Sequence, residues 1–86
     1  MRPDDPFRLA ITPGDLVRVQ VHHPTDGFRP GRTDALEGIF MGNANVPGSI
    51  AVFHGFILLT GDGPIEVMWQ SVVWGGLQSR LSEAQG

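Results

Sequence analysis

The stretch SIAVFHGFILLT, residues 49–60, is the longest apolar run of this 86-residue chain, and it decides the fold. It is rich in β-branched and aromatic residues, which favour strands. We therefore predict a long central strand here, bent at Gly55, because a glycine inside a strand often marks a bend. Both faces of the run are apolar. This pattern predicts that both are covered, either by the far side of a closed barrel or by another subunit.

Other strands can be placed around this central one. Val17, Val19 and Val21 alternate with polar residues over residues 16–22, which is the period of a half-buried strand. Three further strands are predicted at residues 36–41, 65–68 and 72–74. Glycine-rich turns and a short break at residues 69–71 separate them. The sequence therefore predicts an all-β protein with five antiparallel strands.

Proline and glycine mark the remaining segments. Residues 1–12 are predicted as an extended arm, whose apolar residues could pack across the mouth of a barrel or on a neighbouring subunit. Gly38 predicts a bulge or bend, and residues 42–48 predict a turn. Gly75-Gly76 is expected to end the last strand. Residues 13–77 then form the barrel, and residues 78–86 a partly ordered tail, with one or two helical turns possible from Leu77 onward.

Two stretches resemble the SH3-like small barrel. They are PGDLVRV at residues 13–19 and IEVMWQSVVW at residues 65–74, the second reading as strand, short turn, strand. The resemblance covers residues 13–77 and implies a five-stranded antiparallel SH3-like barrel with an extended N-terminal arm. Many unrelated functions share this architecture, so the resemblance bears on fold more than on function.

Two subfamilies of such barrels provide more specific comparisons. KOW-type modules open with a similar Gly-Asp-x-Val phrase, but the basic residues that they use are sparse here. Type II plasmid dihydrofolate reductases are tetrameric barrels of similar size, with the active-site tetrapeptide Val-Gln-Ile-Tyr. The best-placed match, residues 65–68, reads Ile-Glu-Val-Met. The glutamine of that tetrapeptide is replaced here by Glu66 and the tyrosine by Met68. The family's folate and nucleotide contacts therefore cannot be assigned to these residues.

Composition excludes several classes of function. The chain has a net charge of -3, and only 17% of its residues are charged. This composition argues against binding to the phosphate backbone of a nucleic acid. Cysteine is absent, so neither disulfides nor thiolate metal sites are expected. No apolar run approaches the roughly 20 residues of a transmembrane helix, and the N-terminus lacks a signal-peptide pattern. We expect a soluble, cytoplasmic protein with no membrane association.

The long polar loop at residues 23–34 is the best candidate for a recognition surface, because loops of this length are often functional. Phe28, Arg29 and Arg32 could stack on a base and contact phosphates. The two aspartates of the loop would neutralise those arginines, however. We therefore favour a solvated loop that contacts a protein or a small ligand over one that binds nucleic acid.

The three histidines do not predict a metal site. His22 and His23 are adjacent on a strand end, so their side chains point to opposite faces. His54 lies among aromatic residues, where a neutral core or interface histidine is the commoner outcome. A site using His22, His54 and Asp26 would require the fold to bring them together. No nucleophilic constellation or phosphate loop is present, so no catalytic residue, metal or cofactor is assigned.

Aromatic residues point to self-association. Five phenylalanines and two tryptophans exceed what the interior of one small barrel readily holds. Trp69 and Trp74 could each fill the barrel, stack on a ligand or anchor an interface, where aromatic residues are enriched. A homo-oligomer is the preferred inference.

Three functions therefore stand as hypotheses. The preferred one is a non-enzymatic binding and assembly module that self-associates through apolar strand faces and binds a partner or a small ligand. The first alternative is a small oligomeric enzyme, with a site between subunits near His54, Glu66 and Trp69. The second is a KOW-like nucleic-acid-binding module. The candidate binding residues are Phe28, Arg29, Arg32, His54, Glu66, Trp69 and Trp74.

Overall fold

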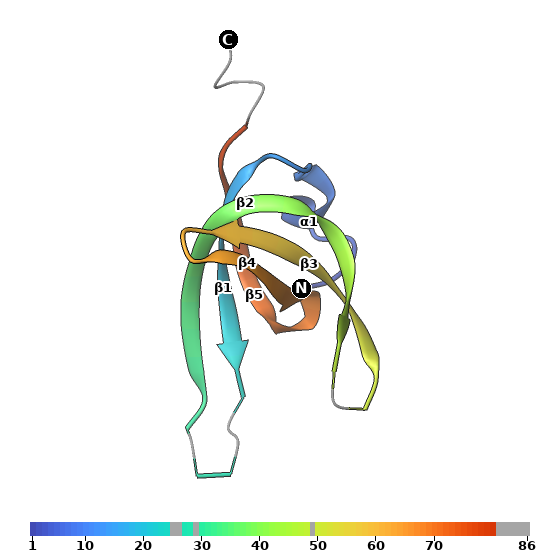
Figure 1. Cartoon of the computed structure of the whole chain (residues 1–86), viewed down its shortest axis with the longest axis vertical. Coiled ribbons are helices and arrows are strands. Elements are labelled where there is room, and N and C mark those ends of the chain that lie inside the picture. Colours follow the sequence, from blue (N-terminus) through green and yellow to red (C-terminus); the bar gives the residue numbers. More distant parts are fainter. Residues whose placement is uncertain (25–26, 29, 49, 81–86) are drawn as a thin grey trace.

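One antiparallel sheet of five strands makes up most of the molecule, as the sequence predicted (Figure 1). The computed structural model describes residues 1–24, 27–28, 30–48 and 50–80. In chain order its elements are α1 (Pro6–Ala10), β1 (Leu16–His23), β2 (Arg32–Pro47), β3 (Val52–Thr60), β4 (Gly63–Met68), the 3₁₀ turn η1 (Trp69–Ser71) and β5 (Val72–Ser79). No helix in the described part of the chain is long and apolar enough to cross a membrane.

The strands lie in the order β4-β3-β2-β1-β5, so β4 and β5 are the two edges of the sheet. The predicted break at residues 69–71 is confirmed as η1, which joins these two edge strands. The sheet curls but is not closed, because β4 pairs only with β3 and β5 only with β1. The β1–β2 and β2–β3 hairpins both extend from the body in one direction (Figure 1).

The hydrophobic core lies on the inner face of the curled sheet. The predicted alternation in β1 is confirmed, since Val17, Val19 and Val21 are all buried. At the centre, the rings of Phe56 and Trp69 have centroids 4.3 Å apart, and Phe40 lies 5.6 Å from Phe56. The buried cluster comprises Ile11, Val17, Val19, Val21, Phe40, Phe56, Leu58, Val67, Trp69 and Val72.

Strand β2 is much longer than the predicted strand at residues 36–41. The turn expected at residues 42–48 is wrong for most of that segment, because residues 42–47 pair with β3. The register shifts between Phe40 and Gly42, and Gly42 has a φ of 119°. The bulge therefore lies at Gly42 rather than at Gly38. A segment rich in asparagine and glycine can continue a strand when one glycine with a positive φ forms the bulge at which the register shifts.

Strand β5 also continues past its predicted end. The strand does not end at Gly75-Gly76. The helical turns that were considered possible from Leu77 onward are wrong for residues 77–79, which belong to β5. Residues 81–86 lie outside the described part of the chain. The two glycines make room for rings. A Cβ on Gly75 would collide with the ring of Phe7, and one on Gly76 would lie 2.6 Å from the end of the Trp74 ring.

The N-terminal arm is helical in its middle rather than extended throughout. Asp5 caps α1 by accepting a hydrogen bond of 3.0 Å from the backbone N–H of Phe7, and Pro6 occupies the first turn. Phe7 meets Trp69 edge-on, with ring centroids 6.5 Å apart. The backbone nitrogen of Met1 donates to the carbonyl of Trp69 at 2.7 Å. The arm therefore packs on the core.

Candidate functional site

The outer face of the sheet carries a continuous apolar surface. Leu16 on β1 lies opposite Ile39 on β2, and Ile39 lies opposite Leu59 on β3. Residues directly opposite each other on adjacent strands share a face of the sheet. The neighbours of these three in sequence, such as Val17 and Leu58, are buried, so this row points outward. We define the outer apolar face as Leu16, Ile39, Met41, Ile57 and Leu59.

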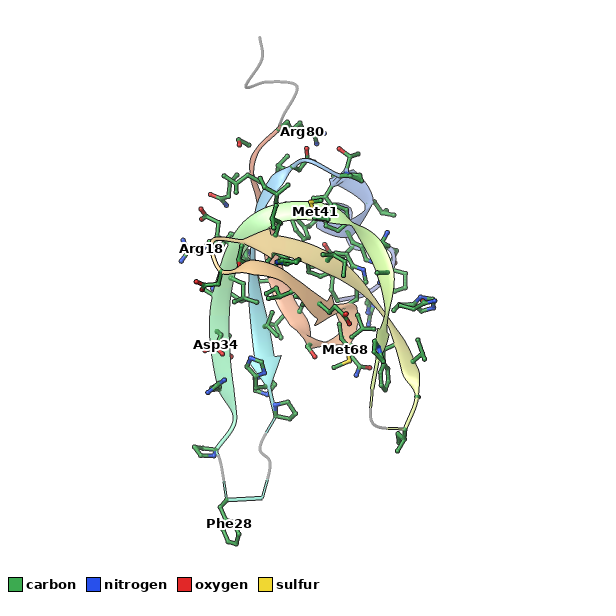
Figure 2. The ribbon with its side chains drawn as sticks, in the orientation of Figure 1. Arg18, Phe28, Asp34, Met41, Met68 and Arg80 are labelled. Atoms are coloured by element: carbon green, nitrogen blue, oxygen red, sulfur yellow. The ribbon has the colours of Figure 1, made fainter. Side chains whose placement is uncertain are left out.

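Several of these side chains are open to solvent in the single chain. Met41 is 50% exposed and Leu59 is 40% exposed, while Ile39 and Ile57 are half-buried. Figure 2 shows Met41 on the curved part of β2. The central strand β3 thus has one face against the core, through Phe56 and Leu58, while the side chains on its other face are only partly covered by the described residues. The prediction that both faces of this strand are covered therefore stays a prediction for the second face.

A second feature is a hollow of about 300 Å³ between the β1–β2 hairpin and β4, which we call the hairpin pocket. Its lining residues are Val21, His23, Leu36, Val46, Ile65, Glu66, Val67, Met68 and Ser71. It is mostly apolar, and Glu66 and His23 are the titratable residues in its lining. Small-molecule sites have this character, an apolar wall with a few polar groups.

The β1–β2 loop places its predicted residues apart. Phe28 lies at the far tip and is fully exposed (Figure 2), and Arg29 lies outside the described residues. Arg32 belongs to β2 rather than to the loop, and its Nε lies 3.2 Å from Asp34 Oδ2. His23 Nε2 lies 3.1 Å from the same oxygen. Exposed contacts of this kind contribute about 0–1 kcal/mol, so they add little to stability.

The two tryptophans differ completely in environment. Trp69 is 2% exposed, and its indole N–H donates to Asn43 Oδ1 at 2.9 Å. Trp74 lies on β5 and is 46% exposed. Trp69 therefore fills the core, and only Trp74 offers a ring face to a partner.

His54 and Glu66 do not share a site within one chain. His54 lies on the same face of β3 as Phe56, whereas Glu66 lies opposite Ile57 on the other face. His54 lines hollows beside Arg8, and Glu66 lines the hairpin pocket. This separation counts against a catalytic site that one copy would build from both residues.

Metal-ligand geometry is absent from the described residues, where no three His, Asp or Glu side chains gather. His22 lies on β1 with its Nδ1 3.5 Å from Thr33 Oγ1, and Asp26 lies outside the described part. His54 is on β3.

Sequence reasoning missed Arg8. Its guanidinium carbon lies 4.7 Å from the centroid of the Trp69 ring. The signal that would have predicted α1 is the pair Asp5-Pro6, because an N-cap residue followed by proline is typical of a helix start. A helix that begins there places Arg8 in its first turn.

Comparisons with protein-family models, with curated proteins and with solved structures each found no match.

Proposed function

We propose that this chain is an SH3-like small barrel that works as a non-enzymatic binding and assembly module in the cytoplasm, self-associating through the outer apolar face. The observation that carries the proposal is the apolar row formed by Leu16, Ile39 and Leu59 across three adjacent strands. Monomeric proteins rarely expose large contiguous apolar surfaces, and such surfaces usually mark interaction sites.

Energetics favour a second copy as the occupant of this face. Burial of apolar surface stabilises a complex by about 25 cal/mol per Å² before the costs of association are subtracted. A standard interface covers about 800 Å² per partner, roughly one-seventh of the 5920 Å² surface of this chain. A two-fold arrangement lets the same face serve both copies, which is the commonest symmetry of homo-oligomers.

We further propose that the β1–β2 hairpin and the adjoining hairpin pocket hold the partner or small ligand. Phe28 at the loop tip and Arg32 at the hairpin base lie away from the outer apolar face, whereas Glu66, a lining residue of the hairpin pocket, stands at the border of that face, opposite Ile57. A module of this kind joins copies of itself through one surface and presents a separate recognition surface on each copy.

Light scattering coupled to size exclusion, over a dilution series, tests self-association. The wild-type chain is expected to elute as an oligomer that dissociates on dilution. Leu59→Glu places a charge on the outer apolar face and should give a monomer, because burying an unpaired carboxylate is costly.

Val73→Glu is the matched control. Val73 is 61% exposed on β5 and is not part of the outer apolar face, so the same change in charge there should leave the oligomer intact. A wild-type chain that stays monomeric at high concentration contradicts the proposal. So does an oligomer that both variants disrupt equally.

A further inference from the structure

Two hollows meet beside the N-terminal helix, at the side chains of Arg8 and His54. The first, of about 310 Å³, is lined by Arg8, Asn43, Ala44, Asn45, His54 and Gly55. The second, of about 300 Å³, shares Arg8 and His54 and is otherwise mainly apolar, with Pro3, Val52, Phe53 and Trp69 in its wall. We call the two together the arginine groove. Neither the outer apolar face nor the hairpin pocket contributes a residue to it.

Arg8 is held in place without being neutralised. Its guanidinium stacks over the buried Trp69, with the guanidinium carbon 4.7 Å from the ring centroid. The ring is itself fixed by its hydrogen bond to Asn43. The ion pairs of the described residues involve Asp34 and do not include Arg8. A guanidinium stacked on an aromatic ring keeps its edge N–H donors available, and their fork matches a carboxylate.

The polar half of the groove adds further donors. Because Asn43 accepts the Trp69 N–H through Oδ1, its amide NH₂ remains available to a ligand. Asn45 lies directly opposite His54 across the β2–β3 pair, on the face that also carries Asn43. Among the described residues, no acidic side chain lines either hollow. The polar half therefore offers a fixed cation with neutral donors around it, which is the chemistry of an anion site.

We propose that the arginine groove binds a ligand made of an apolar body joined to a carboxylate. The carboxylate pairs with Arg8 and receives hydrogen bonds from the asparagine amides. The apolar body occupies the second hollow, against Val52, Phe53 and the edge of Trp69. Either a free carboxylic acid or the C-terminal end of a peptide with an apolar last residue carries this chemistry, and chain ends are recognised in this way by other proteins.

The indole N–H signals provide a direct measurement, because the chain has two tryptophans and they lie in different places. We would titrate ¹⁵N-labelled protein with 3-phenylpropanoate and follow both indole signals by NMR. The Trp69 signal should shift saturably and the Trp74 signal should not. The uncharged analogue 3-phenylpropan-1-ol should bind about tenfold more weakly or worse, since it lacks the charge-assisted hydrogen bonds.

Two variants separate the charge of Arg8 from charge in general. Arg8→Gln should weaken 3-phenylpropanoate binding by about tenfold or more. Arg18→Gln removes the same charge from the outer face of β1 and should leave binding unchanged. Asn45→Ala, at an exposed position of β2, should give a smaller loss of affinity. Native dispersion of the amide signals shows that each variant has folded.

A pair of short peptides ending in phenylalanine, one with a free C-terminus and one amidated, distinguishes the two sources. Binding of the free-ended peptide alone assigns the groove to chain ends, and binding of the free acid alone assigns it to small acids. Three results overturn the proposal. They are no saturable shift of the Trp69 signal with either 3-phenylpropanoate or the free-ended peptide up to about 10 mM, equal affinity for the acid and its uncharged counterpart, and unchanged affinity in Arg8→Gln.

Discussion

Gly55 shows how one missing side chain shapes the centre of the sheet. It lies in β3, opposite Met68 of β4, and it is buried. A Cβ at this position would collide with the carbonyl oxygen of Val67 and with a methyl group of Val46. The glycine therefore lets β2, β3 and β4 approach one another closely at this position, and pairing continues through it without a register shift.

Replacing Gly55 with alanine should destabilise the fold by about 2 kcal/mol or more, because the obstructing atom belongs to the backbone and cannot move alone. Urea unfolding followed by tryptophan fluorescence measures the change. Gly61→Ala is the control, since no heavy atom lies within 4 Å of a Cβ built there. Its effect should stay within about 0.5 kcal/mol. Equal effects of the two substitutions would mean that β3 tolerates a wider spacing than this structure shows.

At the scale of elements, the strands with clear periodicity were predictable and the segments with special residues were not. Alternating valines predict β1, and the run around Phe56 predicts β3. β2 and β5 extend beyond their predicted ends. The glycines in them were read as turns or strand ends, because the sequence does not show which neighbouring atoms a glycine makes room for. Gly42 takes up a bulge and Gly75 makes room for a ring from another element.

The candidate site was less predictable than the fold, for the same reason. Loop composition singled out Phe28 and Arg32, and the structure places them at the tip and the base of one hairpin. Trp69 proved to be a core residue. Arg8 escaped notice because its importance depends on a tertiary contact with Trp69, some sixty residues away along the chain, that no local pattern encodes.

Helix α1 is short and depends on one docking residue. Phe7→Ala should cost about 1–2 kcal/mol, less than the roughly 3–5 kcal/mol of a fully buried phenylalanine, because Phe7 is only partly buried. Leu9→Ala, in the same helix, removes a side chain that is 71% exposed and should change stability by less than about 0.5 kcal/mol. Hydrogen exchange should show loss of protection in α1 for Phe7→Ala only. Protection that is lost equally in both variants would show that the helix is not anchored through Phe7.

At the scale of the whole molecule, the proposed self-association should be insensitive to sodium chloride. An interface centred on Ile39, Ile57 and Leu59 is apolar, and charges such as Glu66 lie at its exposed rim, where they contribute little, so the dissociation constant should change little between about 0.05 and 0.5 M NaCl. Sulfate should strengthen association, because it is excluded from protein surfaces and favours apolar burial. Sedimentation velocity in the two salts checks this. Dissociation by sodium chloride would point to an interface held by ion pairs elsewhere on the surface.

The pairing of β5 with β1 bears on how the polypeptide reaches this state during synthesis. The hairpins β1–β2, β2–β3 and β3–β4 join neighbours in sequence, but Leu16 finds Ser79 only after nearly every intervening residue has left the ribosome. Val17 and Val19 therefore lack part of their cover on a nascent chain, and contacts this distant in sequence are slow to form. Within this sheet, β5 follows the other four strands out of the ribosome and completes the burial of β1.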